Sequence, residues 1–238
     1  MSQEPTTPPT SAKVALITGA GSGIGQSCAH VLRELGYHLA LMGRDLAKLQ
    51  ATAAGFARSS NDAEDRVSLL ACDVADRSGV HAAVDSVIQR WGRIDLLLCN
   101  AGINITQRAF AVLDPADWDA LIATNLTGAF NLVHAVVPHM RARKEGLVIQ
   151  ISSISGLRAG PLGGIAYSAA KYGQSALGLC LGREERHNGI RSTVIYPGEV
   201  ETPILDKRPV KVEAERRAVI LQPEDIAAAV KFLATLHP

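Results

Sequence analysis

The sequence has few cysteines, and none of them lie close together. Only four occur in 238 residues, at positions 28, 72, 99 and 180. Zinc sites and redox pairs need cysteines a few residues apart, as in a CxxC motif. We therefore predict no metal centre, and we expect buried, free thiols in a protein of the reducing cytosol.

The sequence also lacks a net charge and long apolar segments. Its 24 basic and 23 acidic side chains nearly cancel, so no strong field attracts nucleic acid or an anionic membrane. No apolar segment is predicted to approach membrane-span length. The opening MSQEPTTPPTSA has neither the apolar stretch of a secretory signal nor the basic residues of a transit peptide, which predicts a disordered leader at 1–12. We expect a cytoplasmic protein without nucleic-acid or membrane partners.

What the chain contains is an alternation of short aliphatic runs with segments of helical periodicity. Nearly continuous apolar runs are typical of strands buried on both faces. Six occur, at 14–18, 38–42, 67–71, 94–99, 147–151 and 192–196. Gly36 ends the first predicted helix, and Asp114 with Pro115 begins a long one that runs to about residue 140. The pattern predicts one α/β domain over 13–238, with a doubly wound, mainly parallel six-stranded sheet flanked by helices.

A glycine-rich segment, VALITGAGSGIGQS, joins the first predicted strand directly to the first predicted helix. In this position backbone N–H groups can approach a pyrophosphate, and the helix N-terminus faces its negative charge. The spacing is TGxxxGxG rather than GxGxxG, and no Gly-Lys-Ser/Thr follows as in a mononucleotide phosphate loop. An ordinary flexible turn is the alternative, but the flanking strand and helix favour nucleotide binding.

Arg44 follows the second predicted strand, where NAD-binding proteins usually present a carboxylate to the ribose. A guanidinium can pair with a 2′-phosphate, which a carboxylate would repel. Asp45 is expected to cap the next helix. We predict NADP(H) as the preferred cofactor, with NAD(H) possible. The alternative is a surface arginine with loose cofactor choice.

Three further segments carry reactive side chains. The strand LVIQIS ends in hydroxyls at Ser152 and Ser153, followed by Ser155, and ligands of open α/β sheets bind at the carboxyl ends of strands. In YSAAK, the i,i+4 spacing places Tyr167 and Lys171 on one helical face, where an ammonium can lower the pKa of a phenol. Asn125 falls within the apolar face of the long helix. Taken singly, each of these has an ordinary structural explanation.

The segments TGAGSGIG, CDV, NAG, ATN, ISSISG, YSAAK and PGEVET occur in the order typical of short-chain dehydrogenases/reductases. The chain resembles that family from about residue 13 to residue 236. The resemblance implies a single-domain Rossmann fold and an NAD(P)-dependent oxidoreductase that transfers hydride reversibly between nicotinamide and a carbonyl or secondary alcohol. A non-catalytic NADP(H)-binding or sensing protein on the same fold is the alternative.

The resemblance also implies a role for each matching residue. Tyr167 is expected to donate or accept the proton, Lys171 to lower its pKa and hold the nicotinamide ribose, Ser153 to stabilise the substrate oxygen, and Asn125 to support a proton relay. Cofactor contacts are expected from the glycine turn and the later motifs: Gly19, Ser22, Gly23, Ile24, Gly25, Arg44, Asp73, Val74, Asn100, Ala101, Gly102, Tyr167, Lys171, Pro197, Gly198, Val200 and Thr202.

Two departures from the family pattern are visible. Cys99 replaces the first asparagine of the usual NNAG, and no seventh apolar strand follows the last predicted helix. The segment 203–222 mixes apolar and charged residues and is expected to form a lid over a small-molecule substrate. By resemblance we expect a homotetramer or homodimer that uses the long fifth and sixth helices.

Overall fold

The computed structural model describes residues 12–56 and 66–237, so the leader predicted at 1–12 lies outside the described residues except for Ala12. Six parallel strands form one sheet in the order β3-β2-β1-β4-β5-β6. The strands are β1 (Val14–Thr18), β2 (His38–Gly43), β3 (Val67–Ala71), β4 (Leu96–Cys99), β5 (Gly146–Ile151) and β6 (Ile190–Ile195). The predicted α/β, doubly wound class is confirmed.

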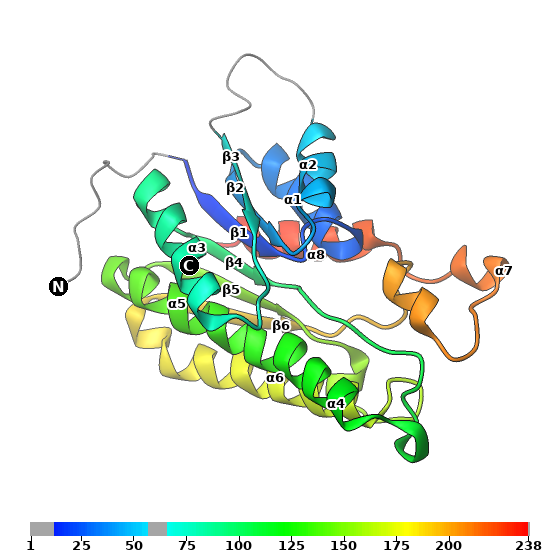
Figure 1. The fold of residues 1–238 in the computed structure, drawn as a ribbon. Coiled ribbons are helices and arrows are strands. Elements are labelled where there is room, and N and C mark those ends of the chain that lie inside the picture. Colours follow the sequence, from blue (N-terminus) through cyan, green and yellow to red (C-terminus); the bar gives the residue numbers. More distant parts are fainter. Residues whose placement is uncertain (1–11, 57–65, 238) are drawn as a thin grey trace.

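Helices cover both faces of the sheet (Figure 1). They are α1 (Gly23–Glu34), α2 (Leu46–Ala54), α3 (Arg77–Trp91), α4 (Pro115–Ile122), α5 (Gly128–Arg143), α6 (Ile165–Glu184), α7 (Ala214–Arg217) and α8 (Pro223–Thr235). Side chains of α1, α2 and α8 pack on one face, and side chains of α3, α5 and α6 pack on the other. Strand β1 shows why the runs are apolar throughout, because Ala15 and Ile17 enter one core while Val14 and Leu16 enter the other.

The chain winds outward from β1 to β3, returns to β4 beside β1, and continues in the other direction to β6. This reversal separates the connections that leave the carboxyl ends of β1 and β4, which is where open α/β sheets bind ligands. Strand β4 begins at Leu96 and not at residue 94 as predicted. Just before it, the Asp95 carboxylate accepts a hydrogen bond from Val14 N at 2.7 Å and pairs with Arg93 and Arg143.

The long helix predicted from Asp114 is interrupted in the middle. Asp114 caps α4 by accepting a hydrogen bond from Ala116 N at 2.8 Å, but a π-helical turn over Ala123–Thr127 separates α4 from α5. After this turn, Phe130 on α5 is 41% exposed. The extra residue of a π turn shifts the helical face that meets the sheet, so one apolar face does not continue unchanged from α4 into α5.

The same helix corrects the expectation about apolar segments. Pro115–Arg143 spans 29 residues and contains an 18-residue stretch with a mean hydropathy of 1.5, so by length and composition it could cross a membrane. More than half of that stretch, 56%, is buried inside the protein, and Figure 1 shows α5 lying along the sheet. Its apolar character therefore matches a core helix.

The cysteine prediction holds only in part. All four cysteines are free; Cys28 and Cys99 are buried, Cys72 is half-buried, and Cys180 on α6 is exposed. Burial raises the pKa of the Cys28 and Cys99 thiols to about 12.

Candidate active site

The glycine turn between β1 and α1 forms one wall of the site. Gly19 and Gly23 have φ angles of 65° and 51°, a left-handed conformation that side chains disfavour. A Cβ on Gly23 would lie 2.9 Å from Thr202 Cγ2, and one on Gly19 would lie 2.8 Å from Asn100 Nδ2. The turn therefore presents backbone at close range, as a bound pyrophosphate requires.

Gly25 was also predicted to contact the cofactor, but it lies beneath this wall and lines neither of the cavities described next. A Cβ there would lie 2.2 Å from Gly19 O. Close by, Thr18 Oγ1 accepts hydrogen bonds from Asn100 N and Ala101 N at 3.0 and 3.1 Å, and Asn100 Nδ2 donates to Thr18 O at 2.9 Å. Gly25 thus permits the helix to pack against a junction that Thr18 and Asn100 hold together.

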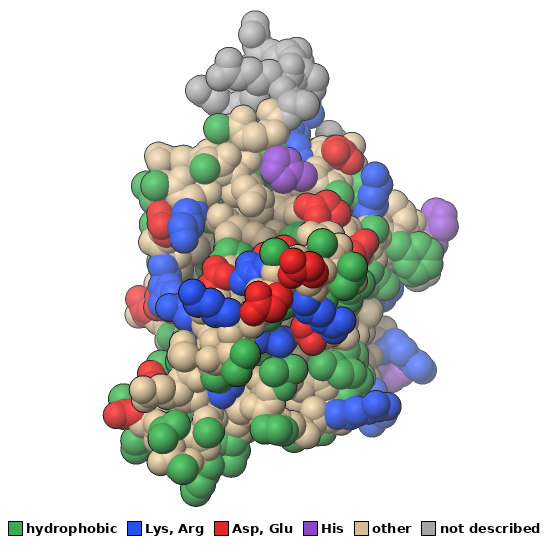
Figure 2. Space-filling view, turned by 90° about the vertical axis from the view of Figure 1, so that its right-hand side faces the viewer, with side chains coloured by type: hydrophobic (Ala, Val, Ile, Leu, Met, Phe, Trp, Pro, Cys, Tyr) green, Lys and Arg blue, Asp and Glu red, His purple; other side chains and the backbone are tan. Residues whose placement is uncertain are grey.

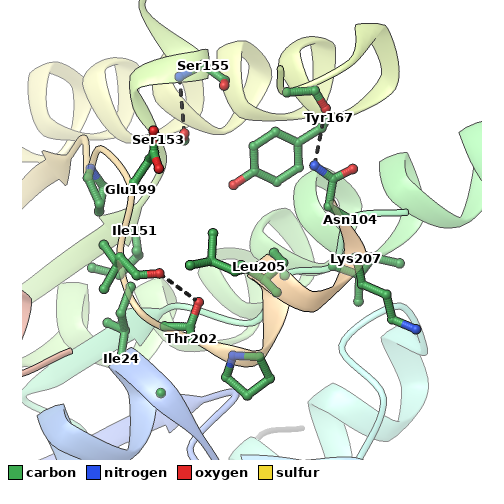
Figure 3. A pocket seen from close by; sticks show the side chains of 18 of the residues that line it. Ile24, Asn104, Ile151, Ser153, Ser155, Tyr167, Glu199, Thr202, Leu205 and Lys207 are labelled. Atoms are coloured by element: carbon green, nitrogen blue, oxygen red, sulfur yellow. Dashed lines mark hydrogen bonds between the residues drawn. The ribbon is translucent and has the colours of Figure 1, made fainter. Parts of the chain in front are cut away.

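The wall opens on a cavity of about 780 Å³ at the carboxyl ends of the strands. Residues from the glycine turn, β4, β5, α6 and the segment after β6 surround it, and Figure 3 shows part of the lining. It brings together most of the predicted residues: Gly19, Ser22, Gly23, Ile24, Arg44, Asn100, Ala101, Gly102, Ser153, Tyr167, Lys171, Pro197, Gly198, Val200 and Thr202. Asp73 and Val74 line an adjoining cavity that also reaches Arg44.

Ser153 and Tyr167 meet inside this cavity. Figure 3 shows the Tyr167 phenol pointing inward, towards the side on which Ser153 lies. The Ser153 hydroxyl acts on the phenol and lowers its pKa, and its Oγ accepts a hydrogen bond from Ser155 N at 3.1 Å. Ser152 is engaged elsewhere, because its Oγ bonds to Ser175 Oγ at 2.9 Å and donates to Lys171 O at 3.1 Å. Of these two adjacent serines, only Ser153 offers its hydroxyl to Tyr167.

The electrostatics of Tyr167 differ from the expectation. Burial raises the pKa of its phenol, while the hydrogen bond from Ser153 and the positive charge of Arg108 lower it. We expected Lys171 to lower the pKa of this phenol. The Lys171 Nζ lies 5.7 Å from the centroid of the Tyr167 ring, and burial lowers the pKa of Lys171 itself to about 7. A buried amine that tends to lose its proton is a weaker source of charge than an arginine.

Lys171 is held in place by main-chain and side-chain acceptors. Its Nζ donates to Ile151 O and to Gln174 Oε1, both at 2.8 Å. Gln174 in turn donates to Cys99 O at 3.2 Å and to Gln150 Oε1 at 3.0 Å. The lysine is therefore anchored to the ends of β4 and β5. Gln174 was not predicted, although its position three residues after Lys171 on the same helical face was a usable signal.

Asn125 lies in the π turn, fully buried and outside the cavity lining. Its Oδ1 accepts from Ile103 N at 2.7 Å, and its Nδ2 donates to Ile103 O at 2.9 Å. Both polar atoms of the amide are thereby satisfied, and the loop after β4 is fixed beside Gly102. A Cβ on Gly102 would lie 3.3 Å from Asn125 Oδ1 and 3.7 Å from Lys171 Nζ, so the amide and the amine flank the same glycine.

Arg108 was missed because a lone arginine in a loop carries no distinctive sequence signal. Its side chain is buried, and it donates to Ile105 O at 2.7 Å, Leu162 O at 3.0 Å and Lys207 O at 2.5 Å. These three carbonyls belong to the loop after β4, the loop before α6 and the segment after β6. Arg108 thus joins the three loops that enclose the inner part of the cavity.

The predicted lid, 203–222, folds over the cavity and is held by ion pairs. Glu199 pairs with Arg208 at 3.5 Å and with Arg216 at 3.4 Å. Arg217 pairs with Glu201 at 2.8 Å. Figure 2 shows acidic and basic side chains gathered together on the face that carries α7. The two ends of the segment meet where Glu201 N donates to Leu221 O at 2.8 Å.

Arg44 stands at the opposite end of the site. Its guanidinium is largely exposed and lies 3.8 Å from Asp73, which is a loose surface ion pair. Lys48 lines the same cavity. Asp45 caps α2 as predicted, accepting a hydrogen bond from Lys48 N at 3.2 Å.

Comparison with known proteins identifies the class. The family model described as short chain dehydrogenase matches residues 13–212. The doubly wound sheet, its glycine turn and the paired Ser153 and Tyr167 hydroxyls belong to an NAD(P)-binding oxidoreductase. The chain belongs to the short-chain dehydrogenase/reductase family, as its motifs predicted.

Individual relatives cover nearly the whole chain. The 3-oxoacyl-(acyl-carrier-protein) reductase of Thermotoga maritima is 33% identical over 229 residues, which is 94% of this chain and 90% of the relative. The cis-4-hydroxycyclohexanecarboxylate dehydrogenase of Sinomonas cyclohexanicum is 34% identical, with coverage of 94% and 89%.

Solved structures agree in fold. The 3-ketoacyl-(acyl-carrier-protein) reductase of Brucella melitensis, complexed with NADH, is 26% identical with a TM-score of 0.82, over 94% of this chain and 90% of that one. A metagenomic short-chain oxidoreductase in complex with NADP is 34% identical with a TM-score of 0.77, over 94% and 91%. This chain is thus similar to enzymes solved with either cofactor, and the family binds NAD(P)(H).

Proposed function

We propose that the protein is an NADP(H)-dependent oxidoreductase that interconverts a carbonyl compound and a secondary alcohol. The observation that supports this most directly is the meeting of the Ser153 and Tyr167 hydroxyls in a cavity that a glycine turn borders. A phenol and a second hydroxyl that line the same cavity can both reach one substrate oxygen. The names of the two relatives describe a 3-oxoacyl reductase and a hydroxy-acid dehydrogenase, which fits this reaction class.

The residues present suit the cofactor. The glycine turn would face the pyrophosphate, Asp73 and Val74 the adenine, Asn100 to Gly102 the middle of the cofactor, and Pro197, Gly198, Val200 and Thr202 the nicotinamide. When bound, the cofactor supplies or accepts the hydride. The protein's part is to hold cofactor and substrate in a reactive arrangement and to move the proton.

Tyr167 would exchange a proton with the substrate oxygen, and Ser153 would donate a hydrogen bond to that oxygen as its negative charge grows. Lys171, anchored by Ile151 O and Gln174, would hold the nicotinamide ribose. Asn125 would act through the loop that it fixes and would support a proton relay beside Lys171. Arg108 adds a fixed positive charge that favours the phenolate.

The cofactor preference rests on Arg44. Its exposed guanidinium and the neighbouring Lys48 line the outer end of the cavity, where a 2′-phosphate would find two cations. Replacing Arg44 with alanine should raise the KM for NADPH about tenfold while changing the KM for NADH little, as expected for the loss of one charge-assisted hydrogen bond. A wild-type enzyme with a lower KM for NADH would refute the NADP(H) assignment.

The reaction class is tested by following cofactor absorbance with a panel of ketones, aldehydes and alcohols. Tyr167→Phe should lower kcat by a factor of about 100 to 10,000, the range for a lost acid/base group, while NADPH binding is retained. Tight NADPH binding without turnover across a broad panel would favour a sensing protein instead.

We further propose that residues 13–238 act as one catalytic domain in the cytoplasm, that 203–222 is its lid, and that α5 and α6 join copies into a dimer or tetramer. Exposed apolar side chains on these helices, including Phe130, Tyr172 and Leu179, support the last point. Sedimentation as a stable monomer would contradict it.

A further inference from the structure

The inner part of the cavity, beneath the predicted lid, has an excess of positive charge. Arg108 and Arg208 line it with largely buried side chains, Arg216 lines it with a side chain that is 59% exposed, and of the described residues around it only Glu199 is acidic. Glu199 already faces two of these arginines. Charges with little access to water are normally paired, so the inner part of this cavity favours an additional negative group.

Of these three arginines, Arg208 is the least satisfied by its described protein neighbours. Its side chain is 16% exposed, and its Nη1 lies 3.5 Å from the Glu199 carboxylate. Within residues 12–56 and 66–237 its guanidinium makes no hydrogen bond. A guanidinium has five N–H donors arranged to fit a carboxylate in a bidentate manner. Arg208 is therefore largely sheltered from water with most of its donors available to a ligand.

Arg108 makes the same place more favourable for an anion. It is 6% exposed, all of its hydrogen-bond acceptors are neutral carbonyls, and no carboxylate of the described residues pairs with it. Burial and, after it, the positive charge of Arg208 lower the pKa of Arg108, because like charges close together repel each other. A negative group close to both would relieve this repulsion.

The position of the arginines assigns the anion to the substrate. Arg108 lies near enough to Tyr167 for its charge to act on the phenol, and it bonds to Leu162 O in the loop before α6. Arg208 and Arg216 line a second opening together with Pro161 and Leu162. Arg44 and Lys48, in contrast, lie at the glycine-turn end of the site, in the cavity that also holds Asp73.

We propose that the substrate carries a carboxylate or another anionic group, which Arg208 binds directly beneath the lid while its carbonyl or hydroxyl carbon faces Tyr167. Arg216 assists from the lid surface, and Arg108 positions the loops and contributes charge. Glu199 keeps Arg208 and Arg216 in the cavity before the substrate arrives. This assignment rests on the proposed function for the carbonyl, but the anion site itself does not depend on it.

The first experiment measures turnover. With NADPH, kcat/KM is compared for levulinate and 4-oxocyclohexanecarboxylate and for the methyl ester of each. The acids should exceed their esters at least about tenfold, and Arg208→Gln should lower the acid-to-ester ratio by about ten- to a hundredfold, as for a lost hydrogen bond to a charged group. Arg208→Lys should recover part of the ratio. Arg183→Gln, on the exposed end of α6, is the matched control and should leave it unchanged.

The second experiment measures binding without reaction. Calorimetry of the enzyme–NADPH complex compares cyclohexanecarboxylate with cyclohexanecarboxamide, which differ in charge and little in shape. The anion site is supported if the wild-type complex binds the carboxylate but not the amide, and if Arg208→Gln no longer binds the carboxylate. If that result accompanies a complete lack of turnover on every substrate, the proposed function fails while the anion site stands.

Three results would overturn the inference. One is equal binding of the amide and the carboxylate, or no carboxylate binding at millimolar concentration. Another is an acid-to-ester ratio that does not change in Arg208→Gln. The third is weaker binding of NADPH itself in that variant, since the anion bound by Arg208 would then belong to the cofactor.

Discussion

From the burial of Lys171 we predict how the free energy of unfolding varies with pH, and this prediction does not depend on any substrate. Burial lowers the pKa of this amine from 10.5 to about 7 in the folded protein, whereas the unfolded chain titrates at its ordinary value. Between pH 7 and 10.5 the unfolded chain therefore binds more protons than the folded protein. Under these conditions the free energy of unfolding rises with pH, and the gain is lost as the pH falls towards 7.

The size of the effect follows from the two pKa values. With a folded value of about 7 and an unfolded value of 10.5, Lys171 lowers the free energy of unfolding by about 4 kcal/mol at pH 7 and by about 2 kcal/mol at pH 9, relative to an amine that is neutral in both states. The contribution of the lysine should therefore become more favourable by about 2 kcal/mol between these pH values.

Urea unfolding of the wild type and of Lys171→Met, at one protein concentration and at pH 7, 8 and 9, isolates this contribution. Methionine cannot titrate in this range, and the other groups cancel in the difference between the two proteins. Losing the hydrogen bonds to Ile151 O and Gln174 adds a constant that leaves the slope unchanged. The exposed Lys13→Met serves as a control. If the free energies of unfolding of the wild type and of Lys171→Met differ by an amount that stays constant within about 0.5 kcal/mol from pH 7 to pH 9, the reasoning is refuted.

Three other outcomes follow from buried contacts. Asn125→Ala should lower the free energy of unfolding by about 1 to 3 kcal/mol, because it leaves main-chain groups of the loop after β4 without their partners; a loss below about 0.5 kcal/mol would mean that the loop finds other partners. Gly128→Ala places a Cβ 2.5 Å from Val74 Cγ2 and should cost about 1 to 3 kcal/mol in urea unfolding, whereas Gly160→Ala, which meets open space, should cost little. Native protein should expose the Cys180 thiol to Ellman's reagent, while the two thiols buried in the core react only after denaturation; full reaction of all four in the native state would contradict the packing.

The strands were predictable because burial on both faces leaves a simple signal. Side chains on both sides of β1 enter a core, so Val14 to Ile17 are all apolar, and the run ends visibly at Thr18, the one polar residue of the strand. The boundary of β4 was less visible, since Asp95 is held by ion pairs with neighbouring Arg93 and with Arg143, which is distant in sequence. The π turn had no signal at all, because the residues of α4 and α5 continue one helical pattern.

The site was predictable where local sequence determines geometry. The glycine turn and the Tyr167 to Lys171 spacing each act within a few residues, and the structure places them in one cavity. Arg108 depends instead on loops that are far apart in sequence, and Glu199 depends on how the segment after β6 folds back on itself. Their importance comes from the carbonyl groups and the arginines that the fold brings near them, and no sequence pattern around either residue indicates these contacts.

The segment between Val200 and Leu221 is closed at its base, and this has a consequence for how the protein can change. Val200 and Leu221 form a parallel bridge, so the intervening residues leave the body and return to it at one point. Loop-closure entropy grows only slowly with length, by about 0.6 kcal/mol for each doubling. The segment can therefore be lengthened, shortened or replaced by that of a relative with little effect on the sheet. Grafting experiments aimed at new substrates should cut at this bridge, where both joints are already paired.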